Sequence, residues 1–321
     1  MLKLVVNRAR IDLRIEPVTP LLIKSGDKGA AMLHPERPDL MFVRTGFGES
    51  ETVYIPGSSL KGVVRSSAER ILRTVGQRAC DPLNQRNDCH KKASELGDEI
   101  ARTREKVEAP HPLAVVHEML CFACRTFGSQ ASAGRVAFAD AYPPTDERLQ
   151  ANATERRNGV SIDRQTGGPA KGKLFEMEIV TGGAFDTSIT MTNVELWQVG
   201  LIGIVLRDIE VGFVRLGSAK TRGLGHVRVV PQSVMFEQTD PTRKTAAPAG
   251  VAALRNDLAK PYGFVGGAGD KLASATGAKV DKTSLGHRFT FKETERAWAF
   301  LDACAEKPWA DFCARKTETR S

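Results

Sequence analysis

The chain is predicted to form an α+β fold in which an antiparallel sheet is backed by two helices. Residues 9–16 alternate between apolar and charged side chains, which is typical of a strand with one buried face. Residues 60–75 place apolar side chains at steps of three and four, and residues 194–209 are almost continuously apolar, so both stretches predict helices. Short strands are expected at residues 134–142, 174–180 and 226–230. This order is that of a ferredoxin-like (RRM-like) sandwich, although the aromatic motif by which RNA-recognition motifs stack bases is absent.

The first predicted helix follows a glycine turn in the stretch YIPGSSLKGVVRSSAERIL, residues 54–72. Ser58 and Ser59 are good N-cap residues, so the helix is expected to begin there. Lys61 then falls in the first turn, where the helix dipole disfavours a cation, and Arg65 follows one turn later. A glycine turn, unpaired backbone N–H groups and a lysine suit a bound phosphate. The alternative is a capped helix whose basic side chains are only solvated.

The net charge of +8 over 321 residues is concentrated in two places. Residues 60–78 hold five lysines and arginines against one acid, and residues 214–228 hold four with no acid. Such a local excess is typical of a surface that binds the phosphates of RNA. No apolar run reaches membrane-spanning length and the first residues lack a signal-peptide pattern, so we expect a cytoplasmic protein.

Residues 76–133 are largely polar and lack apolar periodicity, so we interpret them as an insertion that cannot build its own core. They contain four of the six cysteines, two of them with the C-x-x-C spacing of a zinc site. The expected ligands of a structural Zn²⁺ are Cys80, Cys89, Cys121 and Cys124. His90 or His117 is an alternative ligand at one position. The other interpretation is a reduced pair beside two unrelated cysteines.

Two glycine-rich basic loops and one long loop supply the remaining functional candidates. The segment GSAKTRGLG leads into a strand, whereas a dinucleotide-binding motif opens a helix. Its glycines are expected to let the backbone approach a polyanion, with Lys220 and Arg222 neutralising the charge. The long loop after the first strand contains Asp27 and Asp39, residues that by themselves are more often found in turns. Residues 233–321 are expected to form a linker and a C-terminal extension of unassigned fold.

Four phrases of the sequence resemble one family in combination. IPGSSLKGVVRS, IDRQTGGPAKGKLFEMEI and GSAKTRGLGHVRV, in this order, resemble the RAMP superfamily of CRISPR-associated proteins over about residues 5–232. The group that looks most similar is the backbone subunits of type III effector complexes, the seventh Cas protein family. CFACRTFGS looks like the cysteine-containing variants of this group, in which zinc is expected. The resemblance identifies residues 1–232 as a RAMP, ferredoxin-like RNA-binding domain and residues 155–173 as a thumb hairpin.

The resemblance implies a protein of antiviral defence that binds a CRISPR guide RNA beside other RAMP subunits and small subunits, with no membrane partner. It also implies a metal-dependent endoribonuclease, using Mg²⁺ or Mn²⁺, that cuts complementary single-stranded target RNA at regular intervals. Asp39 is the implied catalytic residue, and Asp27 is the alternative. The RNA contacts expected from the loops and the helix are Ser58, Ser59, Lys61, Arg65, Arg164, Lys171, Gly217, Lys220, Arg222, Gly223 and Gly225.

Two other functions are compatible with these residues. A backbone subunit can hold the guide without cutting the target. A stand-alone nuclease that processes precursor CRISPR RNA would use a histidine near the glycine loop, and His226 has that position, although a histidine in a strand is more often structural.

Overall fold

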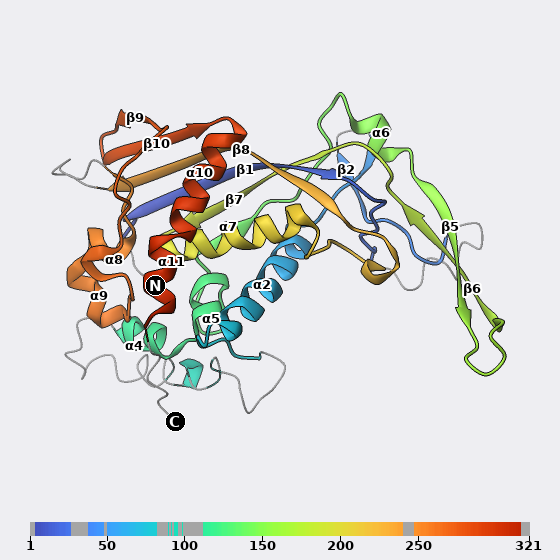
Figure 1. Cartoon of the computed structure of the whole chain (residues 1–321), viewed down its shortest axis with the longest axis horizontal. Coiled ribbons are helices and arrows are strands. Elements are labelled where there is room, and N and C mark those ends of the chain that lie inside the picture. The colour runs from blue at the N-terminus through green and yellow to red at the C-terminus, as the bar shows by residue number, and fades with distance from the viewer. Residues whose placement is uncertain are drawn as a thin grey trace.

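A computed structural model describes residues 4–26, 38–47, 50–81, 89, 91, 93–95, 98, 112–239 and 247–315 of the chain. Within these residues, six strands form one antiparallel sheet in the order β4-β7-β1-β8-β10-β9 (Figure 1). The strands are β1 (Asn7–Pro17), β4 (Val136–Phe138), β7 (Phe185–Thr192), β8 (Val227–Thr239), β9 (Lys279–Lys282) and β10 (Gly286–Lys292). The predicted mixed fold with a large antiparallel sheet is therefore confirmed.

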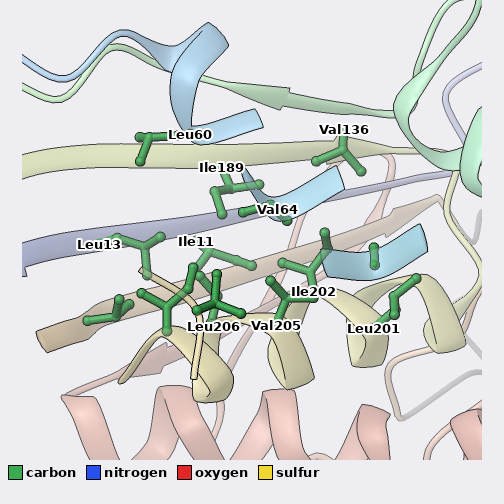
Figure 2. Packing of buried hydrophobic residues seen from close by; sticks show 14 of the residues in the cluster. Ile11, Leu13, Leu60, Val64, Val136, Ile189, Leu201, Ile202, Val205 and Leu206 are labelled. Atoms are coloured by element: carbon green, nitrogen blue, oxygen red, sulfur yellow. The ribbon is translucent and has the colours of Figure 1, made fainter. Parts of the chain in front are cut away.

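The three longest described helices cover one face of this sheet (Figure 1). They are α2 (Gly57–Thr74), α7 (Leu196–Val211) and α10 (Thr294–Ala305). Ile11 and Leu13 of β1 lie in the core with Leu60 and Val64 of α2 and Leu206 of α7, and all five are buried (Figure 2). The alternation along β1 has the expected cause, because every second side chain enters this core.

The charged side chains of β1 point to the opposite face of the sheet, where they form cross-strand ion pairs. Arg14 donates to both carboxylate oxygens of Asp186 on β7, at 2.9 and 3.1 Å. Glu16 accepts from Arg228 on β8 at 2.7 Å. Along β1 this face thus carries paired charges instead of rings on which nucleotide bases could stack.

The domain boundary expected at residue 232 lies inside β8, and the sheet continues past it into β10 and β9. Helix α10 packs against α7 at Gly200, where an added Cβ would lie 2.3 Å from the carbonyl oxygen of Cys304. Phe312 stacks on Trp197 of α7, with ring centroids 4.0 Å apart. The smaller helices of this part are α8 (Val251–Leu254), α9 (Asn256–Tyr262) and α11 (Lys307–Cys313). The C-terminal part therefore shares the core of the rest of the chain.

A long hairpin projects from the body of the molecule (Figure 1). Its strands are β5 (Glu155–Ile162) and β6 (Pro169–Ile179), so it extends beyond the thumb expected at residues 155–173.

The other elements are β2 (Arg44–Phe47), β3 (Ser50–Val53), α4 (Pro112–Met119), α5 (Phe122–Phe127) and α6 (Arg148–Asn152). None of the helices in the described ranges has the length and apolarity needed to cross a membrane.

The contact between α7 and α10 leaves no room for a side chain at Gly200. We expect Gly200→Ala to lower the free energy of unfolding by about 3 kcal/mol, the upper end for overpacked sites, because the new Cβ would meet a helix backbone that cannot move alone. Denaturant unfolding followed by circular dichroism measures the change. Gly62→Ala is the control, since Gly62 is an exposed position of α2 with open space around it, and should be neutral or stabilising by up to ~1 kcal/mol. Equal unfolding free energies for Gly200→Ala and the wild type would contradict the close packing.

Candidate nucleic-acid interface

Four segments that are distant in sequence meet at the base of the hairpin, and we call this region the junction. It consists of residues 20–25, 38–43, 175–180 and 215–225. Leu21 and Val180 exchange two backbone hydrogen bonds, of 2.8 and 2.9 Å. Ser218 donates its backbone N–H to the carbonyl of Leu22 at 2.8 Å, which fixes the glycine loop to the same segment, residues 20–25. The junction therefore brings the glycine loop, the hairpin base and the segment around Asp39 together.

Asp39 lies at the junction with an exposed side chain. Its Oδ2 accepts a hydrogen bond from the backbone N–H of Glu176 on β6, at 2.9 Å. Leu40, the next residue, donates to the Glu176 carbonyl at 3.0 Å and accepts from the Glu178 N–H at 2.9 Å. The structure thus holds Asp39 against the hairpin, whereas Asp27 lies outside the described residues.

The carboxylate of Glu178 fixes the Asp39 segment from the other side. It accepts from both terminal nitrogens of Arg44, at 2.8 and 2.7 Å, from the Thr154 hydroxyl at 2.7 Å and from the Phe42 backbone N–H at 3.0 Å. Burial raises the pKa of the Glu178 carboxyl, but the hydrogen bonds from Arg44 and Thr154 outweigh it and hold that pKa below its usual range. Glu178 is therefore a buried and paired carboxylate at the base of the hairpin.

Two of the loop glycines are required by close approach within the protein. Gly217 has φ +74°, and an added Cβ would lie 2.3 Å from the Leu22 carbonyl oxygen; Gly225 has φ +85°, and its Cβ would lie 2.1 Å from the Leu216 carbonyl oxygen. Gly223, with φ +87°, faces open space. Packing within the protein thus accounts for Gly217 and Gly225, whereas the open space at Gly223 is compatible with the approach of a polyanion, and the RNA contacts of all three stay predictions.

The basic side chains of the glycine loop lie beside the hairpin and α2. The guanidinium of Arg222 lies over the ring of Phe175 on β6, 5.6 Å from its centroid. Partial burial and the neighbouring charge of Arg70 on α2 lower the pKa of Lys220. Arg164 and Lys171 are exposed in the outer part of the hairpin. The structure thus brings Lys220 and Arg222 together and places Arg164 and Lys171 farther out.

The start of α2 differs from the prediction. The helix begins at Gly57 with Pro56 as its N-cap, so Ser58 and Ser59 lie inside the first turn and neither caps the helix. Gly57 instead donates its backbone N–H to Oδ1 of Asp140, at 2.7 Å. A carboxylate of the protein therefore takes one of the positions expected for a phosphate. Ser58 is exposed and Lys61 is half-buried in the same turn.

The four cysteines of the predicted zinc site are brought together. Their sulfur atoms lie within 4.8 Å of one another, and the Cys80 sulfur lies 3.6 Å from those of Cys89, Cys121 and Cys124. Four sulfurs at zinc–sulfur distances of about 2.3 Å in a tetrahedron would be ~3.8 Å apart. The cluster can therefore hold a metal ion, and its spacing and donor atoms are compatible with structural zinc.

The described histidines that were considered as a zinc ligand or a catalyst, His117 and His226, have hydrogen-bond partners outside the cysteine cluster. His117 donates from Nδ1 to the Tyr262 carbonyl and accepts at Nε2 from Arg135, each at 2.8 Å, so it belongs to a buried network instead of the cysteine cluster. His90 lies outside the described residues. The ring of His226 lies against the end of α7, with Nε2 3.4 Å from the Glu210 carbonyl. His226 lies directly before β8 instead of within a strand, and its ring contacts the end of α7.

A model of the RAMP superfamily matches residues 14–228. This chain belongs to the RAMP superfamily. The match begins in β1 and ends in β8, so it includes the junction, the hairpin and the cysteine cluster. RAMP proteins are associated with CRISPR-related RNA binding, and the superfamily includes some ribonucleases. A search of curated proteins gave no match to this chain.

The junction of this RAMP protein depends on Glu178, so Glu178→Gln should destabilise it. We expect a loss of about 2 kcal/mol in the free energy of unfolding at pH 7, because charge-assisted hydrogen bonds are replaced by weaker ones. Since the folded-state pKa of Glu178 is lowered, its contribution is complete above its unfolded pKa of about 4.3 and is lost as the pH falls through the folded value. The difference between variant and wild type should therefore shrink below pH ~4.

Denaturant unfolding across this pH range provides the measurement. The control is Glu176→Gln, because Glu176 is more exposed and its oxygen lies 3.7 Å from Arg156, a separation at which an ion pair contributes less than about 1 kcal/mol. A loss for Glu178→Gln that does not depend on pH would show that its charge is not what holds the segment.

Proposed function

We propose that this RAMP protein is a backbone subunit of a type III CRISPR effector complex that binds the guide RNA and cuts complementary target RNA at regular intervals. The observation that carries the proposal is the junction, which lies within the family match and joins Asp39 to the hairpin and the basic glycine loop. The element order and strand order β4-β7-β1-β8, with α2 and α7 on one face, support the ferredoxin-like fold expected of such a subunit.

Guide binding would use the loops and helix termini, since the charged face of β1 offers no stacking surface. Lys220 and Arg222 would neutralise backbone phosphates, and the open position at Gly223 would let the RNA approach. Ser58 and Lys61, in the first turn of α2, would extend this track. Arg164 and Lys171, exposed on the hairpin, would contact the guide–target duplex where the hairpin crosses it.

Cleavage would use the target's own 2′-hydroxyl as the nucleophile. The 2′-oxygen attacks the adjacent phosphorus, the bond to the 5′-oxygen of the next nucleotide breaks, and the products are a 2′,3′-cyclic phosphate and a 5′-hydroxyl end. Asp39 would accept the 2′-hydroxyl proton or help to bind Mg²⁺ or Mn²⁺, a cation that stabilises charge on the phosphoryl oxygens. The hairpin would unstack the neighbouring base and favour the in-line geometry. The hydrogen bond from Glu176 to Oδ2 would leave Oδ1 as the atom that acts.

That same hydrogen bond favours a second candidate function. One oxygen of Asp39 already accepts from the Glu176 N–H, an arrangement also suited to a residue that only anchors the hairpin. In that case the chain is a guide-binding backbone subunit that does not cut. The four cysteines serve the same purpose in both candidates, as a structural Zn²⁺ site that stabilises the insertion.

Guide binding is tested first. We expect Lys61→Ala to weaken binding of every guide sequence and to reduce the slope of log K against log salt by about 0.7, the value for one phosphate contact on a single strand. Titration of labelled CRISPR RNA at several salt concentrations measures both quantities. Lys279→Ala on the edge strand β9 is the control and should leave the slope unchanged. An unchanged slope for Lys61→Ala would remove Lys61 from the RNA track.

Cleavage is tested in the complex assembled with its guide. We expect Asp39→Ala to slow the cutting of complementary RNA at least ~100-fold, since proton transfer by a positioned group contributes 10² or more. Mapping the cut positions on end-labelled target RNA gives the rate at each site. Asp281→Ala on β9, which removes another partly exposed aspartate, is the control. Guide binding without cutting by the wild type would favour the second candidate, and full cutting by Asp39→Ala would exclude Asp39 from the reaction.

A further inference from the structure

Helix α2 directs a row of charged side chains toward the cysteine cluster. Arg65, Glu69 and Arg73 follow one another at single-turn spacing, and Glu69 accepts from Arg65 at 2.8 Å and lies 3.7 Å from Arg73. Arg65 was expected to contact RNA from this helix. Its side chain is instead only 23% exposed and reaches the sulfur of Cys124.

Each nitrogen of the Arg65 guanidinium has a partner within the protein. Nε donates to Glu69 at 2.8 Å, Nη1 donates to the Gly128 carbonyl at 3.0 Å, and Nη2 lies 3.6 Å from Sγ of Cys124. Three of the five N–H groups of this guanidinium are thus directed to partners within the protein, and its side chain is mostly buried.

A buried zinc site with four cysteine ligands is stabilised by positive charge and hydrogen-bond donors close to it. Four thiolates and one Zn²⁺ leave a net charge of about −2, and Cys121 and Cys124 are each 2% exposed, so water solvates this charge poorly. The backbone N–H groups of Cys121 and Cys124 donate to the sulfurs of Cys89 and Cys121 at 3.3 and 3.4 Å. Arg65 is a full charge that also reaches the cluster, at Cys124.

We propose that Arg65 is the counter-charge of this cysteine site and that retention of the metal depends on it. The inference rests on the structural zinc site proposed above and assigns Arg65 to it instead of to the RNA. Arginine suits this position better than lysine, because a planar fork can reach a carboxylate, a carbonyl and a sulfur at once, whereas an ammonium group is a compact point charge.

Arg73 supports the same site from the next turns of the helix. Its Nη2 donates to the carbonyl of Cys80 at 2.8 Å and its Nε to that of Ala79 at 3.2 Å, which fixes the backbone that carries one ligand. The cysteine site and the helix that begins the proposed RNA track are thus joined through two arginines. Residues that orient metal ligands in this way commonly change metal affinity 10–100-fold when they are replaced.

Zinc release from the full-length protein tests the inference. Zinc content is measured by mass spectrometry, and its transfer to the chromophoric chelator 4-(2-pyridylazo)resorcinol gives the release rate. We expect Arg65→Gln to release zinc at least ~10-fold faster than the wild type, and Arg65→Lys to fall between them. Arg70→Gln is the matched control on α2, because Arg70 is exposed and donates to Ser67 of the same helix. Cys121→Ser should hold little or no zinc.

The outcomes separate this inference from the proposed function. Equal release rates for the wild type and Arg65→Gln would overturn the role of Arg65 while leaving the zinc site intact. A wild-type protein that binds no zinc would overturn both the zinc site and the role of Arg65. Guide binding and target cutting would still be tested by their own experiments. Weaker guide binding by Arg65→Lys with unchanged zinc release would return Arg65 to the RNA track. Circular dichroism shows whether each variant is folded. If Arg65→Gln is unfolded, the zinc release rate of Arg65→Lys is compared with that of the wild type instead. Equal rates for these two proteins would count against the proposal.

Discussion

The central strand β1 is the constraint on which the rest of the structure depends. It is bonded to β7 on one side and β8 on the other, so each of its side chains must face either the helices or the opposite surface of the sheet. Its apolar side chains fix α2 and α7 on one face, and its charged side chains form ion pairs on the other. The chain that leaves β1 then supplies the carbonyl of Leu22 and the backbone of Leu21, to which the glycine loop and the hairpin are bonded.

The junction shows how a projecting hairpin is held on a globular body. Most side chains in its outer part are exposed and bury little apolar surface, so its orientation must come from its base. There the backbone of β6 is bonded to Leu21 and Leu40, and the Glu178 carboxylate holds Arg44 and Phe42 from the facing segment. Rigidity at the base is what a hairpin needs if it is to act on a bound polymer at a fixed distance.

The features that could be predicted from the sequence are those that depend on residues close together in the chain. The alternation of β1, the apolar stripe of α2 and the apolar run of α7 correspond to elements of the structure, and the C-x-x-C pair indicated the cysteine cluster. The pairing of Asp140 with the start of α2 joins residues 83 positions apart in the chain, and no periodicity carries that information. The direction of Arg65 was missed for a related reason, since a sequence reports that a helical arginine is polar but not which polar neighbour the fold supplies. Glu178 was missed for the same reason, because its partner Arg44 lies 134 positions away in the chain.

Helix α7 is apolar on nearly all sides because it lies between the sheet and α10. An ordinary surface helix would need polar side chains where Gly200 and Gly203 now meet the backbone and side chains of α10. The apolar composition of this helix therefore depends on α10, which lies outside the residues that match the family. In a shorter relative without α10 and α11, the positions that match these glycines should carry charged or amide side chains, and that difference can be read directly from its sequence.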